Sequence, residues 1–141
     1  MVDPKLPPSA QRLHETLMSA WPRLAGRVEF VREGAESVEL GSADLVVSAH
    51  ACGALTDFVL SRATAAHARV AVLPCCHDLD RSDTSGLTGW LDGPMAVDVV
   101  RAMRLRAAGY RVWTQTISPD ITPKNRLLVG APCASGADRL T

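Results

Sequence analysis

The sequence predicts an α/β domain in which short strands and helices alternate along most of the chain. Apolar runs rich in Val, Leu and Ala are separated by segments of helical periodicity, and the last two runs lie close enough to form a hairpin. The 141 residues are 47% hydrophobic but only 4% aromatic, which is typical of small helices packed on a sheet. This length predicts one domain over residues 1–141.

The N-terminal segment predicts one helix followed by one strand. Residues 7–26 have apolar side chains at helical spacing, with Ser9 as the expected N-cap and Gly26 as the expected end. Residues 27–31, RVEFV, alternate apolar and polar side chains, a pattern that indicates a short strand.

The middle of the chain predicts a strand, a helix and a second strand. Residues 43–49, ADLVVSA, are continuously apolar, which indicates a strand buried on both faces. Residues 55–68 predict a helix capped by Asp57. Residues 69–74, RVAVLP, predict another buried strand, which ends at its proline.

The C-terminal third predicts a helix and a hairpin. Residues 94–110 begin with Pro94 and stop at Gly109, and their apolar stripe is Ala96, Val99, Val100, Met103 and Ala107. The charged residues of this helix are interpreted as a solvated face: Asp98, Arg101 and Arg104. Residues 111–117 and 125–131 predict two antiparallel strands.

Alternating strands and helices imply right-handed crossovers and a mostly parallel sheet that closes with the C-terminal antiparallel hairpin. Ligands gather at the carboxyl ends of such strands. Two predicted strands end there in thiols and imidazoles, first in HACG (residues 50–53) and then in PCCH (residues 74–77). If the strands are neighbours, both segments face one cleft and form the walls of a site.

The composition excludes several classes of protein. Fifteen basic and fifteen acidic residues cancel, which argues against strong non-specific binding of nucleic acid. The first fifteen residues contain no apolar signal region, and no apolar run is long enough to cross a bilayer, so we expect no membrane association. Four cysteines without a secretory signal are expected to be reduced thiols in the cytoplasm.

The order of elements resembles that of the class I S-adenosylmethionine-dependent methyltransferases, whose sheet is Rossmann-like. The segments HACGALTD and PCCHD resemble a subgroup that includes the tRNA 2′-O-methyltransferases of the acceptor stem, and ITPKNRLLVG is similar to the hairpin of a wider set of methyltransferase-like proteins. The resemblance implies S-adenosyl-L-methionine as cofactor and methyl transfer to an acceptor that the sequence does not identify: RNA, protein or a small molecule.

The resemblance assigns expected roles to individual residues. It implies cofactor binding by Asp3 on the ribose, by the loop after the third family strand near adenine, and by the end of strand 43–49: Asp3, Gly34, Ala35, Glu36, Ala49 and Gly53. It implies a reacting centre formed by His50, Cys52, Cys76 and His77. It further implies substrate contacts from the hairpin residues Asn125 and Arg126. An imidazole titrates near neutral pH, so either histidine is a candidate general base.

Each of these residues also has a plainer interpretation. Asp3 before Pro4 is typical of an exposed turn, and Asn125 and Arg126 of a turn with a solvated charge. For His50 and Cys52 the alternative is a buried histidine and a cysteine acting as a small hydrophobe, and the site interpretation is preferred. For Cys75, Cys76 and His77 three readings stay open: metal ligands, a strained vicinal disulfide, and the wall of the pocket. Because consecutive cysteines lack the usual C-x-x-C spacing, the wall is preferred and no stoichiometric metal is expected.

The sequence departs from the family in one respect, since it contains no G-x-G turn and nothing that corresponds to the first family strand. MVDPK is interpreted as the end of the second family strand. A sheet without its central strand exposes two edges, so we expect self-association and weak cofactor binding by this chain unless RVEFV closes the gap. A segment further upstream, a partner chain, or pairing of RVEFV with ADLVVSA are three ways to close the gap. A non-catalytic binding module and a small Cys/His metal-binding protein are the alternative functions.

Overall fold

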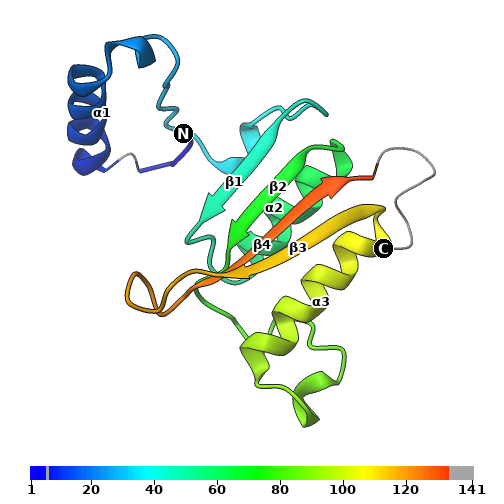
Figure 1. Ribbon diagram of the computed structural model, residues 1–141. Coiled ribbons are helices and arrows are strands. Elements are labelled where there is room, and N and C mark those ends of the chain that lie inside the picture. Colours follow the sequence, from blue (N-terminus) through cyan, green and yellow to red (C-terminus); the bar gives the residue numbers. More distant parts are fainter. Residues whose placement is uncertain (6, 134–141) are drawn as a thin grey trace. The chain divides into compact units, whose positions relative to one another are not determined.

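The computed structural model describes residues 1–5 and 7–133 and contains, within them, three α-helices and one four-stranded sheet (Figure 1). The chain divides into two compact units, Met1–Glu39 and Leu40–Thr141. The single domain expected from the sequence stays a prediction. Within the described residues, no helix has both the length and the apolarity required to cross a membrane.

In the first unit, helix α1 (Pro8–Ala20) begins one residue earlier than its expected cap. Pro7 is the N-cap and Pro8 is the first helical residue, because proline lacks the N–H that the first turn leaves unpaired. Ser9 is therefore not the cap. The helix ends at Ala20, before Gly26, because Pro22 opens a separate 3-10 turn, η1 (Pro22–Leu24).

The expected strand RVEFV is not present as a strand. Val31 forms an isolated parallel bridge with Val2, in which the Asp3 amide donates to the Val31 carbonyl at 3.1 Å. The Val31 amide donates to the Met1 carbonyl at 2.8 Å. RVEFV thus forms one bridge within its own unit, and its pairing with ADLVVSA stays one of the three possibilities.

The second unit contains the sheet, whose strand order is β1-β2-β4-β3. Strands β1 (Leu45–Ala49) and β2 (Arg69–Leu73) pair in parallel. Strand β4 (Arg126–Pro132) is antiparallel to both β2 and β3 (Tyr110–Thr116). β1, β2 and β3 therefore run in one direction, as expected, and the closing hairpin is confirmed. The insertion of β4 between β2 and β3 was not foreseen.

Helices α2 (Ala54–Ala65) and α3 (Gly93–Ala107) pack on the same face of the sheet and form the core with it. The core cluster takes side chains from both helices and three strands: Val59, Leu60, Ala63, Ala68, Val70, Val72, Leu105, Tyr110 and Leu128. Gly130 on β4 allows this close packing, because an added Cβ would lie 3.2 Å from both Leu105 and Tyr110.

The buried face of α3 differs from the expected stripe. Ala96 and Val100 are buried as expected, but Met103 is 59% exposed. Arg101 is only 1% exposed, so its assignment to a solvated face is wrong, whereas the Arg104 side chain is 58% exposed. The helix starts at its Asp92 cap, whose carboxylate accepts the Met95 amide at 2.9 Å.

Strand β1 is not buried on both faces, contrary to the sequence-based expectation. Leu45 is 53% exposed and Val47 is 71% exposed, while Val46 packs against the core. The reason lies in the strand order, since β1 stands at an edge of the described sheet and is covered on one face by α2.

Candidate functional site

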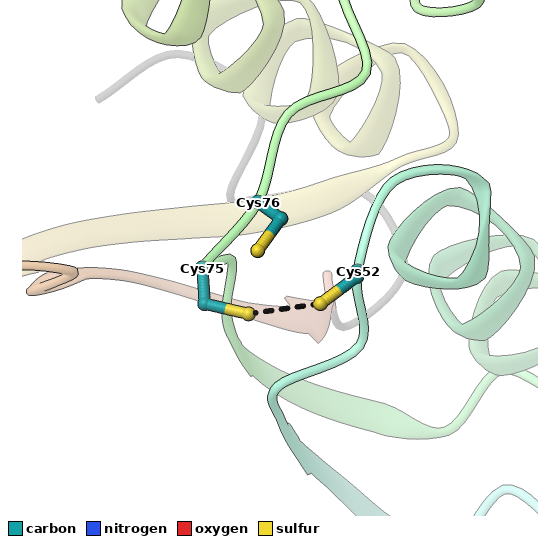
Figure 2. A group of neighbouring side chains, drawn as sticks. All are labelled: Cys52, Cys75 and Cys76. Atoms are coloured by element: carbon teal, nitrogen blue, oxygen red, sulfur yellow. Dashed lines mark hydrogen bonds between the residues drawn. The ribbon is translucent and has the colours of Figure 1, made fainter.

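The two motif segments lie side by side, as the sequence predicted. Ala49 and Leu73, the last residues of β1 and β2, are register partners, so both loops leave the same edge of the sheet. The Gly53 amide donates to the Cys76 carbonyl at 3.0 Å. Figure 2 shows the thiols of Cys52, Cys75 and Cys76 converging from the two loops. The proximity of HACG and PCCH is confirmed, while the roles of their residues stay predictions.

The first loop has an unusual backbone. His50 has φ 62°, in the left-handed region that is uncommon for a residue with a side chain. Gly53 has φ 56° and ψ −127°, a combination that glycine adopts far more readily than other residues. The Thr56 hydroxyl donates back to the Ala51 carbonyl and fixes the loop to the start of α2. These features turn the chain sharply and present Cys52 towards the second loop.

The three thiols perturb one another. The Cys52 and Cys75 sulfurs are 3.3 Å apart, and this hydrogen bond, followed by that with Cys76, raises the pKa of Cys52 to about 12. The same contacts act in the opposite direction on Cys76: hydrogen bonds from Cys52 and Cys75, with the nearby Lys124 charge, lower the pKa of its thiol. The thiolate is therefore favoured on Cys76 over Cys52.

His77 is held by a carboxylate. Its Nε2 lies 2.8 Å from Asp98 Oδ1, and the histidine side chain is 4% exposed. The other oxygen of Asp98 accepts from Arg126 Nε at 2.8 Å. When Nε2 donates its proton to Asp98, the neutral ring leaves Nδ1 as its acceptor atom. Asp98 thus fixes the orientation of His77 and of Arg126 together.

Arg101 connects this pair to the first loop. Its guanidinium contacts Asp57 through Nε at 3.0 Å and Nη2 at 2.8 Å, a bidentate ion pair. It also donates to the Gly53 carbonyl at 3.1 Å and to Asp98 at 3.3 Å. Asp57 therefore forms an ion pair with the buried Arg101 of α3 and is not a helix cap, contrary to expectation. The guanidinium, whose side chain is 1% exposed, compensates two carboxylates that are 34% and 12% exposed.

A small polar pocket lies beside His77. It has a volume of about 160 Å³ and is lined by Pro74, His77, Asp92, Pro94, Pro123, Lys124, Asn125 and Arg126. A larger, mainly apolar pocket of about 350 Å³ shares Pro74 and Arg126 with the small one and is lined by residues of α3 and the hairpin, Asp98 among them. Three residues singled out from the sequence, His77, Asn125 and Arg126, thus meet in one pocket, because the β3–β4 loop returns to the edge where β2 ends.

Four expected cofactor residues lie in the first unit. Asp3 accepts the Lys5 amide at 2.8 Å, the turn that its plain interpretation predicted, and its own amide pairs with Val31. The Val2–Val31 bridge is parallel, so the two segments that it joins run in the same direction. Asp3 follows Val2, and the loop of Gly34, Ala35 and Glu36 follows Val31, so both lie beyond the same end of the bridge. A Cβ on Gly34 would clash with the Glu36 carboxylate, so Glu36 folds back over this glycine. Ala49 and Gly53 belong to the second unit, at the end of β1.

Sequence reasoning missed Asp57, Asp98 and Arg101 as site residues. Each was interpreted from its local neighbourhood, as a cap or as part of a charged face. A usable signal was present, because Val97, Arg101 and Leu105 repeat at intervals of four and therefore share the buried face of α3. An arginine at such a position requires a carboxylate partner, and the nearest acidic residue on the preceding helix is Asp57.

Comparison with known proteins gives a family match over the part of the chain that contains both loops. A family model described as a methyltransferase domain matches residues 4–81, more than half of the 141-residue chain. No curated protein and no solved structure matches the chain significantly.

Proposed function

Because the chain belongs to this methyltransferase domain family, we propose that it transfers the methyl group of S-adenosyl-L-methionine to a hydroxyl acceptor bound beside His77. The observation that carries this proposal is the histidine held by Asp98 in a pocket with Asn125 and Arg126. The cofactor supplies an electrophilic methyl group, and this chain's residues supply orientation, exclusion of water and a proton acceptor.

His77 is favoured over His50 as the general base. A base needs a fixed orientation and an acceptor atom within reach of the substrate. The hydrogen bond from Nε2 to Asp98 fixes the ring and leaves Nδ1 to receive the proton of the acceptor hydroxyl. His50 lies in a left-handed backbone conformation at the start of the first loop, which gives that loop its turn.

The pocket favours an acceptor that carries negative charge near its hydroxyl. Lys124 and Arg126 contribute two cations to the lining, against one carboxylate from Asp92, and Arg126 is also paired with Asp98. The Asn125 side-chain N–H already donates to the Ile117 carbonyl at 2.8 Å. Phosphate oxygens pair well with such side chains. Together with the resemblance of HACGALTD and PCCHD to tRNA 2′-O-methyltransferases, this favours RNA as the acceptor.

The first unit fits the cofactor in part. Asp3 presents a carboxylate, which suits two ribose hydroxyls, and it stands beside the loop of Gly34 and Glu36. The Glu36 carboxylate covers Gly34, so a flat adenine ring reaches this glycine only after Glu36 rotates. Binding of the cofactor is therefore expected to require a rearrangement of one side chain.

The proposal is tested by methyl transfer from radiolabelled S-adenosyl-L-methionine. The purified chain is incubated with total tRNA, with cell protein and with a small-molecule extract, and cofactor binding is measured separately by calorimetry. We expect label in RNA, and we expect His77→Gln to lower turnover by about 100-fold or more while changing cofactor affinity little. His67→Gln is the matched control, since His67 is an exposed histidine that precedes β2 at the opposite edge.

The outcomes separate the possible functions. Label in protein or in a small molecule would overturn the RNA assignment but keep methyl transfer. Cofactor binding without turnover in any fraction would favour the non-catalytic module. Equal turnover in wild type and His77→Gln would remove the base and leave positioning as the role of this pocket.

A further inference from the structure

Three thiols form a cluster that is separate from the lining of the pocket beside His77. The side-chain sulfurs of Cys52, Cys75 and Cys76 all lie within 4.8 Å of one another, and none of the three residues lines the pocket of His77. Figure 2 shows the three side chains pointing towards a common space from two different loops. We propose that Cys52, Cys75 and Cys76 together bind one zinc ion through their three thiolates.

The spacing of the sulfurs matches what zinc requires. Two sulfurs on one tetrahedral zinc lie about 3.8 Å apart, given a zinc–sulfur bond of about 2.3 Å. The Cys52–Cys75 separation of 3.3 Å and the outer limit of 4.8 Å bracket this value. Small rotations of the side chains therefore bring all three sulfurs to bonding distance. Thiolates are soft ligands that select zinc over the hard cations magnesium and calcium.

The backbone between the adjacent cysteines does not oppose coordination. The sequence-based argument against metal rested on the adjacency of Cys75 and Cys76, which lack the usual C-x-x-C spacing. Among the described residues, positive φ outside glycine is confined to His50, His67 and Ser85. Cys75 and Cys76 thus direct both sulfurs towards Cys52 with ordinary backbone angles. The third ligand, Cys52, comes from the HACG loop. It adds the spacing between ligands that the adjacent cysteines of PCCH lack.

The loops are held in place before any ion binds. The amide of Gly53 is bonded to the Cys76 carbonyl, and the carbonyl of Gly53 accepts from the buried Arg101. His77 is engaged with Asp98 through Nε2, which leaves the three thiols as the ligand set. Since Cys52 and Cys76 are exposed, the fourth position of a tetrahedral ion is open to water. The zinc site does not depend on methyl transfer, because it uses none of the acceptor residues.

The test measures metal binding by the full chain, purified with a non-thiol reductant and stripped with a chelator. Zinc is titrated in competition with a chromophoric chelator, and cobalt is used as a spectroscopic substitute. We expect one ion per chain and an absorption band from thiolate-to-cobalt charge transfer. Cys52→Ser and Cys76→Ser are expected to lose the ion and the band, whereas the matched control Cys133→Ser keeps both.

A second measurement guards against variants that fail to fold. Zinc is expected to raise the melting temperature of the wild type and of Cys133→Ser, and to leave that of Cys52→Ser unchanged. Circular dichroism of the metal-free proteins checks that Cys52→Ser, which alters an exposed residue, remains folded. Equal zinc uptake by wild type and Cys52→Ser, or a cobalt complex without the thiolate band, would overturn the proposal. Methyl-transfer assays and cofactor titration on the same samples report on the proposed function separately.

Discussion

Arg101 joins three segments that are far apart in the sequence. It contacts Asp57 on α2, Asp98 on its own helix and the carbonyl of Gly53 in the first loop. Its side chain is 1% exposed, so these contacts replace water that the guanidinium has lost. The arginine therefore contributes to stability and also fixes the loop that carries Cys52.

Replacement of Arg101 by methionine is expected to destabilise the fold strongly. Asp57 would lose its bidentate partner, whereas Asp98 would keep its contacts with Arg126 and His77. Because Asp57 is 34% exposed, the expected cost is about 2 kcal/mol, below that of breaking a fully buried pair. Urea unfolding measures the change in the free energy of unfolding. Arg104→Met is the matched control, because the Arg104–Asp83 pair is exposed at 58% and 46% and a solvated pair contributes little to stability. Similar losses in both variants would contradict the role assigned to Arg101.

The residues of the site differ in how far the sequence alone predicts their roles. His77, Asn125 and Arg126 were recognised because their residue types and their places at strand ends carry chemical information. Asp98 and Arg101 were not, because a charged residue on a helix is usually solvated and only the packing of α3 against α2 shows otherwise. Cys75 and Cys76 were recognised as a pair, but their convergence with Cys52 depends on the loop turn at His50 and Gly53.

Among the helices and strands, the Tyr110 side chain connects the start of β3 to the end of α2. Its hydroxyl lies 3.0 Å from the Ala63 carbonyl and 2.9 Å from the Ala68 carbonyl, and the residue is 3% exposed. A hydroxyl has one proton to donate, so the two carbonyls share it. The ring packs with Leu105 and Val70 in the core cluster.

Tyr110→Phe is expected to lower the free energy of unfolding by about 1 kcal/mol, because the ring stays and one shared hydrogen bond is lost. Burial raises the pKa of Tyr110 above its usual value. The neutral hydroxyl is thus favoured in the folded state, and its contribution is present below the unfolded pKa and is lost as pH rises through the folded pKa. Above about pH 10 the wild type should lose stability faster than Tyr110→Phe. Parallel pH profiles of the two proteins would show that this tyrosine does not control alkaline unfolding.

The helices and strands of the second unit were predicted to within a few residues, because each has a strong local signal. The apolar runs of β1 and β2, the proline at the start of α3 and the Gly109 stop act over a few neighbours. The place of β4 between β2 and β3 was not predictable in this way, since it depends on pairing between residues such as Val72 and Leu128. RVEFV shows the converse, because a local alternating pattern alone does not make a strand.

For association of whole chains, the second unit offers the outer edge of β1 as a contact surface. Within the described sheet, β1 pairs only with β2, which leaves one side of its backbone unpaired. On the face opposite the core, the register aligns a row across all four strands: Val47, Ala71, Val129 and Trp113. Val47 is 71% exposed and Trp113 is 45% exposed. An unpaired strand with an apolar row is a template for a second copy of the chain.

We therefore expect the purified chain to self-associate as its concentration rises in sedimentation velocity. Val47→Lys should shift the distribution to monomer, because a lysine on an edge strand must bury its charge when a second copy pairs there. Trp90→Lys serves as the control, since Trp90 is 89% exposed and lies outside the sheet, and it should leave association unchanged. A wild type that stays monomeric at the highest concentration, or an equal response of both variants, would exclude β1 as the contact. An equal response of both variants would instead reflect general surface hydrophobicity, because both substitutions exchange an exposed apolar side chain for the same cation.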